Sequence, residues 1–288
     1  MPDLSISQNF LTDAKLIRRL AIKAGISKDD VVLDIGSGKG IITEVLASIA
    51  DSVISLELDP KLHAQVREKF SGDSHVHVLN ENFLLYSLPL KPYKVFSNIP
   101  FSITSLIVNK LLFTGRVPED TFLVVQKEAA DRFMGKGEGY LFSLLTQPFF
   151  DFSVFYKFKR EDFTPRPLVN VVMLRMRKKK EPLIALNLRE QYLDFVCYVV
   201  NQQKPTLKLR LNRLFTALQY YRISDELNFS VTSKVKDLTL PQWISLFERY
   251  VSFVDSEKKS ITGGSYSKYR KVTSGLGKVT RTKARRPL

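Results

Sequence analysis

The chain of 288 residues carries 44 Lys and Arg against 29 Asp and Glu, a formal net charge of +15, and contains a single cysteine, Cys197. One cysteine excludes a disulfide framework and a cysteine-based zinc site, and it favours a reducing compartment. No secretory signal is visible, and the longest apolar-rich stretch, residues 140–158, is too interrupted by polar residues and proline to span a bilayer. We therefore expect a cytoplasmic protein with no membrane partner.

Helical and strand patterns alternate over the first part of the chain. Residues 12–25 keep the helical spacing of apolar residues, with Thr12 and Asp13 able to cap the start. Short apolar runs with β-branched residues predict strands at 31–35, 53–57, 76–79, 94–97 and 121–125, with helices at 41–50, 60–70 and 102–113. Strands that alternate with helices predict a doubly wound, mostly parallel α/β sheet of the Rossmann-like type.

The pattern changes after residue 150. Residues 152–159 and 169–177 predict two antiparallel strands separated by a proline-bearing loop, 163–167, and residues 182–253 have helical periodicity. Two apolar stripes in that part are predicted to be core. They are Leu207, Leu211, Leu214 and Leu218, and Trp243, Phe247 and Tyr250. We expect a first domain of residues 1–180, an all-helical domain of residues 181–255 and a basic tail of residues 256–288.

The basic tail carries much of the excess charge. Residues 258–288 contain ten Lys and Arg and no Asp or Glu, many Gly, Ser and Thr, and few large apolar side chains. Such a composition predicts disorder in isolation, and a mobile polycation is attracted to the phosphates of nucleic acid. A solubilising role is the alternative, and a membrane-surface anchor is disfavoured because the tail has no amphipathic apolar face.

A glycine loop follows the first predicted strand, with the sequence Asp34-Ile35-Gly36-Ser37-Gly38-Lys39-Gly40. Strand, glycine turn and helix form the general device for a nucleotide-like cofactor, because glycine lets the ligand approach the backbone. The spacing fits neither the dinucleotide fingerprint nor a P-loop. S-adenosylmethionine (SAM), which has an adenosine and no phosphates, suits it, with a nicotinamide or flavin site and a structural turn as alternatives. Glu57 ends the next strand, where a carboxylate can hold a ribose.

A second motif, Asn98-Ile99-Pro100-Phe101, ends the predicted strand at 94–97, on the sheet edge where ligands bind. The amide oxygen of Asn98 and a backbone carbonyl near Ile99-Pro100 can accept both N–H bonds of an exocyclic amine. The nitrogen lone pair would then face a methyl donor, and Phe101 could stack on the base. A strand-terminating turn is the alternative for this motif alone; after a SAM-type loop, the amine pocket is favoured.

Five motifs in order resemble the Erm family of ribosomal RNA adenine-N6 methyltransferases, which give resistance to macrolides, lincosamides and streptogramin B. The resemblance covers residues 5–255. The motifs are Ser7-Gln8-Asn9-Phe10-Leu11, the glycine loop, Leu56-Glu57-Leu58-Asp59, Asn98-Ile99-Pro100-Phe101 and Phe163-Thr164-Pro165-Arg166-Pro167-Leu168-Val169-Asn170.

The resemblance implies roles for matching residues. Asn9 and Leu11 would line the methionine end of SAM, Gly36 and Gly38 would approach the cofactor, and Glu57 would hold its ribose. Asn98 would touch both cofactor and target amine. Phe101 and Phe163 would sandwich an adenine extruded from the RNA.

One position departs from the family pattern. The family usually has Asp where this chain has Asn82, and that Asp accepts the adenine amine of SAM. Asn82 could do the same through its side-chain oxygen, so cofactor binding is expected to survive. The related small-subunit dimethyladenosine transferases usually differ at Ile99, Phe101 and Asn170, where this chain has the Erm-like residue.

The resulting hypothesis is an enzyme that transfers one or two methyl groups from SAM to one adenine of 23S ribosomal RNA. The alternatives are adenine dimethylation of 16S ribosomal RNA and a non-catalytic nucleic-acid-binding factor on the same fold. His63, His75 and His77 lack metal-ligand spacing, so no metal is expected. The family resemblance favours a monomer.

Overall fold

A computed structural model describes residues 9–113 and 115–272 and divides into two compact units. The first contains the described residues as far as Gly137 together with Phe150–Lys180, and the second contains Glu138–Phe149 and the described chain from Glu181 onward. Residues 138–149 thus join the second unit although they precede the last strands of the first. Tyr192 explains this, because its buried hydroxyl donates to the carbonyl of Leu144 at 2.9 Å.

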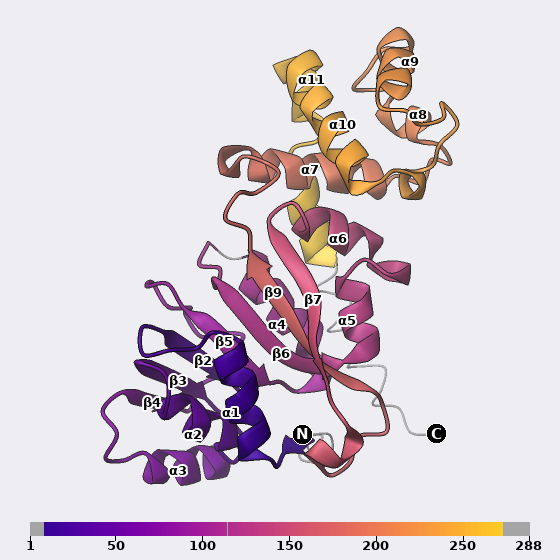
Figure 1. The fold of residues 1–288 in the computed structure, drawn as a ribbon. Helices are drawn as coiled ribbons and strands as arrows, with labels where there is room; N and C mark the ends of the chain where they lie inside the picture. Colours follow the sequence, from indigo (N-terminus) through magenta and orange to yellow (C-terminus); the bar gives the residue numbers. More distant parts are fainter. Residues whose placement is uncertain (1–8, 114, 273–288) are drawn as a thin grey trace, which may run out of the picture. The chain divides into compact units, whose positions relative to one another are not determined.

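The first unit is built on a seven-stranded sheet of order β4-β3-β2-β5-β6-β9-β7. Its strands are β2 (Val31–Ile35), β3 (Ser52–Leu56), β4 (Val76–Leu79), β5 (Lys94–Asn98), β6 (Asp120–Gln126), β7 (Phe150–Lys157) and β9 (Val171–Lys178). The first five in spatial order are parallel, and β9 and β7 complete the edge in antiparallel pairing. The predicted doubly wound, mostly parallel sheet is confirmed, and helices flank it on both faces (Figure 1).

The helices of this unit start where the sequence supplies caps. They are α1 (Ala14–Lys23), α2 (Ile41–Ala47), α3 (Pro60–Lys69), α4 (Thr104–Phe113) and α5 (Lys127–Phe133). Asp13 accepts hydrogen bonds from two backbone N–H groups at the start of α1, and Asp59 does the same for α3. Pro60 occupies the first turn of α3, where it costs no helical hydrogen bond.

A separate two-stranded sheet was not predicted. β1 (Phe10–Leu11) pairs antiparallel with β8 (Phe163–Thr164), so that Phe10 lies opposite Thr164 and Leu11 opposite Phe163. The pairing joins two of the sequence motifs, about 150 positions apart. The described chain also contains short turns of 3-10 helix: η2 (Phe101–Ile103), η3 (Gly137–Gly139), η4 (Arg160–Asp162), η5 (Leu186–Leu188) and η6 (Val235–Asp237).

The second unit is helical, as predicted for this part of the chain. It contains α6 (Tyr140–Thr146), α7 (Arg189–Val200), α8 (Leu207–Leu211), α9 (Ala217–Glu226), α10 (Leu240–Phe253) and α11 (Ser256–Ser260). Phe195 of α7 packs against Trp243, Phe247 and Tyr250 of α10, with ring centroids 4.6–6.3 Å apart. The leucine stripe is buried except for Leu218, which is 61% exposed. The prediction of Leu218 as core is wrong, because the chain turns between α8 and α9 and breaks the helical spacing.

The structure also corrects part of the predicted disordered tail. After α11, residues 265–272 form another helix. The Asp194 carboxylate accepts from the N–H groups of Gly264 and Tyr266, both at 2.9 Å, and the buried hydroxyls of Tyr250 and Thr262 lie 2.8 Å apart. Composition alone missed these specific partners in α7 and α10. Residues 273–288 lie outside the described residues. No helix in the described part of the chain is long and apolar enough to cross a membrane.

Candidate active site

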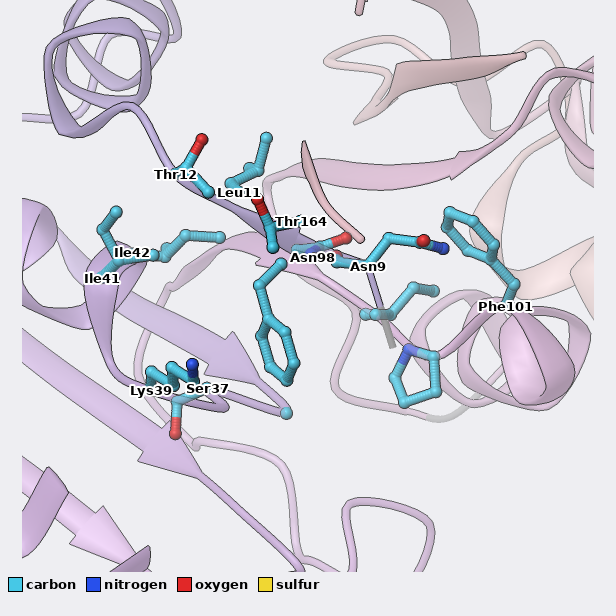
Figure 2. A pocket seen from close by; sticks show the side chains of 14 residues that line it. Asn9, Leu11, Thr12, Ser37, Lys39, Ile41, Ile42, Asn98, Phe101 and Thr164 are labelled. Carbon is cyan, nitrogen blue, oxygen red and sulfur yellow. Dashed lines mark hydrogen bonds between the residues drawn. The ribbon is translucent and has the colours of Figure 1, made fainter. Parts of the chain in front are cut away.

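A cavity of about 340 Å³ opens where β2 and β5 end, at the carboxyl edge of the sheet. Three segments and one residue of β8 line it (Figure 2). The lining residues are Asn9, Phe10, Leu11, Thr12, Gly36, Ser37, Lys39, Ile41, Ile42, Asn98, Ile99, Pro100, Phe101 and Thr164. The cavity therefore brings together the opening motif, the glycine loop and the Asn-Ile-Pro-Phe motif, and seven of the eleven predicted site residues belong to it.

The glycine loop requires its glycines. Gly36, Gly38 and Gly40 have φ angles of +71°, +58° and +80°, a region that residues with a side chain rarely adopt. A Cβ on Gly38 would stand 2.7 Å from Cε1 of Phe10, so the aromatic ring packs directly on the loop. The Lys39 ammonium lies 5.6 Å from the centroid of that same ring. Phe10 thus covers the loop and forms part of the cavity wall.

Glu57 is only 4% exposed and holds the glycine loop from the neighbouring strand end. Its Oε2 accepts from the Gly38 N–H at 2.7 Å and its Oε1 accepts from the Asp59 N–H at 2.8 Å. A carboxylate offers about four acceptor positions, so Glu57 retains capacity for two ligand hydroxyls. It does not line the 340 Å³ cavity itself.

Asp34 lies beneath the loop, fully buried at the end of β2. Burial raises the pKa of its carboxyl to about 7, the nearby Glu57 charge adds to the rise, and the hydrogen bond from Thr43 opposes it. The Thr43 hydroxyl donates to Oδ2 at 2.8 Å, and Oδ1 has no hydrogen-bond partner within the described chain. Asp34 therefore joins the end of β2 to α2, and it is not among the residues that line the cavity.

Asn98 is held in one orientation by the opening motif. Its Nδ2 donates to the backbone carbonyl of Asn9 at 2.7 Å. Among the described residues nothing donates to its Oδ1, which leaves an acceptor at the cavity wall. The Pro100 carbonyl accepts from the Ile103 N–H at 3.2 Å. The Ile99 carbonyl accepts no such hydrogen bond in the described chain, so it is the carbonyl that could accept from the target amine.

Four predicted site residues lie outside the cavity lining. Gly38 packs against Phe10, which is a lining residue. Glu57 follows β3 and accepts a hydrogen bond from the Gly38 N–H. Phe163 is 2% exposed and packs edge to face on Phe158, with centroids 5.3 Å apart. Phe163 therefore does not face Phe101 across open space in this structure. Asn82 lies in the turn after β4, where its Oδ1 accepts from the Leu84 N–H at 2.9 Å.

Sequence reasoning assigned no site role to several lining residues, namely Phe10, Thr12, Ser37, Lys39, Ile41, Ile42 and Thr164. Phe10, Thr12, Ser37, Lys39 and Thr164 each stand next to a predicted site residue, so the sequence offered a signal for them. Ile41 and Ile42 at the start of α2 have no such neighbour.

The fold and this site define a nucleotide-cofactor-binding α/β protein of the methyltransferase type, in which the Asn-Ile-Pro-Phe motif and the glycine loop line one cavity. The sequence profile of the family described as "Ribosomal RNA adenine dimethylase" matches residues 4–252, and the chain belongs to that family. The resemblance inferred from the motifs is confirmed.

Individual proteins similar to this chain are also named as ribosomal RNA methyltransferases. A protein named "rRNA adenine N-6-methyltransferase" from Bacteroides fragilis is 31% identical over 86% of this chain and 93% of its own length. A protein named "Ribosomal RNA small subunit methyltransferase A" from Acaryochloris marina is 30% identical over 85% and 96%. The crystal structure of the 23S rRNA methyltransferase ErmE is 32% identical, with a TM-score of 0.74, and the match covers 84% of this chain and all of that one.

Proposed function

We propose that the protein transfers methyl groups from SAM to the N6 amine of one adenine in 23S ribosomal RNA, and so confers resistance to macrolides, lincosamides and streptogramin B. The observation that carries the proposal is the fixed amide of Asn98, with Oδ1 at the wall of a cavity shared with the glycine loop. Similarity to ErmE over the whole of that chain supports 23S ribosomal RNA as the substrate.

The residues of the cavity fit SAM. Ser37 lines it with a buried Oγ that has no hydrogen-bond partner within residues 9–113 and 115–272. Gly36 lines the cavity without a side chain, and a Cβ there would meet Pro100 at 3.5 Å. Asn9 and Leu11 would line the methionine end, and Glu57 would accept the ribose hydroxyls. When bound, SAM supplies an electrophilic methyl group.

The target amine would be held by acceptors only. Its lone pair is delocalised into the adenine ring, so it is a weak nucleophile until its two N–H groups are directed elsewhere. Asn98 Oδ1 and the Ile99 carbonyl would accept them, which turns the lone pair toward the methyl carbon. Phe101 at the cavity wall would stack on the base, worth roughly 1–3 kcal/mol. Most of the rate enhancement would come from this positioning.

Phe163 would serve the proposed adenine sandwich only if the β8 segment moved, because its ring is buried here. The structure therefore favours Phe101 as the first stacking partner.

Basic residues 273–288 would add sequence-independent attraction to RNA phosphates. We further propose that the protein acts in the cytoplasm as a monomer and needs no metal.

Dimethylation of 16S ribosomal RNA is the second candidate, favoured by the similarity to the small-subunit methyltransferase from Acaryochloris marina. One assay separates the candidates. The protein is incubated with labelled SAM and either protein-free 23S RNA or assembled small subunits. Label in the 23S RNA supports the proposal, label only in small subunits supports the second candidate, and RNA binding without label in either supports a non-catalytic factor.

A further inference from the structure

Asn82 begins a short turn directly after β4, and both of its oxygens are used inside that turn. The side-chain Oδ1 accepts from the Leu84 N–H at 2.9 Å, and the backbone carbonyl accepts from the N–H groups of Leu85 and Tyr86 at 2.8 and 3.0 Å. A backbone N–H can only donate, so the side-chain atom facing Leu84 must be the oxygen. The amide nitrogen is the only polar side-chain atom of Asn82 with no partner among the described residues.

The turn is also held from outside. The Lys110 ammonium on α4 donates to the carbonyls of Phe83 and Tyr86 at 2.7 and 2.5 Å, and lies 5.1 Å from the centroid of the buried Phe83 ring. Rotating the Asn82 amide by half a turn would place its NH₂ against the Leu84 N–H, donor facing donor. These contacts therefore fix the orientation of the Asn82 amide and leave its NH₂ as the group without a partner in the described chain.

The turn stands beside the ribose-holding end of the site. Asn80, two residues earlier, donates through Nδ2 to the carbonyls of Glu57 and Leu58 at 2.9 and 3.3 Å. That contact ties the start of the turn to the end of β3, at the carboxyl edge where ligands of parallel sheets bind. A cofactor whose ribose reaches Glu57 would place its base near Asn82.

We propose that Asn82 meets the purine of the cofactor with a hydrogen-bond donor rather than an acceptor. The inference rests on the proposed function, and it differs from the expectation that the Asn82 oxygen accepts the adenine amine. An aspartate at this position would use one oxygen for the Leu84 N–H and still offer the other to the 6-amine. The amide NH₂ opposes a 6-amine and matches a 6-oxo group, so Asn82 lowers the selectivity of the site for adenine.

The test compares two ligands by isothermal titration calorimetry on the full chain. They are S-adenosylhomocysteine and its 6-oxo analogue, S-inosylhomocysteine. Replacing a donor by an acceptor changes one hydrogen bond in opposite directions for the two bases. Asn82→Asp is therefore expected to shift the ratio of the two affinities toward the adenine ligand by about tenfold. A ratio within about twofold of that of the unchanged protein overturns the inference.

Two further variants keep the result decisive. Glu81→Gln changes an exposed charge next to the turn without altering Asn82, and the ratio should stay the same; a shift as large as that of Asn82→Asp would assign the effect to charge and overturn the inference. Asn82→Ser keeps a capping oxygen for Leu84, and it removes the amide NH₂ and leaves only the hydroxyl of a shorter side chain. Its ratio should move toward the adenine ligand, and if Asn82→Asp does not fold, an unchanged ratio in Asn82→Ser overturns the inference.

If the proposed function itself is wrong, the binding and methyl-transfer measurements give a different result. In that case the unchanged protein binds neither homocysteine ligand and transfers no label from SAM to either ribosomal RNA. If methyl transfer to 23S RNA is observed and only the ratio fails to respond, the proposed function stands and the role given to Asn82 is wrong.

Discussion

The side chain of Asn98 is oriented by the backbone of Asn9, whose carbonyl accepts from Nδ2 at 2.7 Å. The contact joins the strand end of β5 to the segment that leads into β1. It leaves the acceptor atom of Asn98 at the cavity, and it uses a backbone group, which no side-chain substitution at position 9 removes. The opening motif therefore fixes the orientation of the first side chain of the Asn-Ile-Pro-Phe motif.

Asn98→Ala should reduce methyl transfer by at least about a hundredfold, because the acceptor that directs the amine is lost along with its anchor. RNA affinity should stay nearly unchanged, since phosphate contacts dominate it. Single-turnover transfer from labelled SAM and filter binding of the same RNA measure the two quantities. A parallel loss of both would show that Asn98 acts on RNA binding instead.

Gly38→Ala should lower the free energy of unfolding more than Gly36→Ala does, by about 1–3 kcal/mol. Both glycines have positive φ, so backbone strain is similar, but a Cβ on Gly38 stands 2.7 Å from the Phe10 ring while one on Gly36 meets Pro100 at an ordinary 3.5 Å. Urea unfolding gives the two values. In a Phe10→Ala background the difference should vanish, and its persistence would place the strain elsewhere.

The sequence predicted those parts of the fold whose signal is local. Residues 31–35 and 76–79 are strands with the predicted bounds, since a run of β-branched and apolar residues suits a sheet buried on both faces. Asn98 and Phe101 line one cavity with the glycine loop, because the parallel strands that precede these segments end at the same edge of the sheet. The placement of Phe163 and Thr164 depends on pairing with β1, far along the chain, and no local pattern reports such a partner.

Two features that the sequence did not indicate have the same cause. Residues 140–146 form a helix anchored by Tyr192, and residues 256–272 fold because Asp194 and Tyr250 offer them hydrogen bonds. Composition gave no indication of these distant partners. Asn82 shows what the sequence leaves open at the candidate site. The residue type is known from the sequence, but the orientation of its amide depends on the hydrogen bond from the Leu84 N–H.

The contribution of Asp34 to the stability of the protein should fall as the pH rises from about 4 to about 7. Its pKa is about 7 in the fold against 3.8 for an ordinary aspartate. Within this window the folded protein keeps a proton that the unfolded chain has released, so raising the pH favours unfolding, by up to about 4 kcal/mol. Asn cannot titrate, so Asp34→Asn should lack this component in urea unfolding at pH 5 and pH 7.5. Identical pH dependence in both proteins would show that Asp34 is ionised throughout.

Two truncations should separate the folded C-terminal segment from the basic residues beyond it. A chain ending at residue 272 loses five Lys and Arg and no acidic residue. Its unfolding free energy should be unchanged, while the slope of log affinity for RNA against log salt should become shallower by up to about 3.5, at roughly 0.7 for each single-strand phosphate contact.

A chain ending at residue 254 also loses the partners of Asp194 and Tyr250. Its unfolding free energy should fall by about 1–3 kcal/mol, because the buried Tyr250 hydroxyl is left without Thr262. Urea unfolding and salt-dependent filter binding on both truncated chains measure these effects. A salt slope that changes only with the longer truncation would locate the RNA contacts in residues 255–272, where five more Lys and Arg stand on the folded segment.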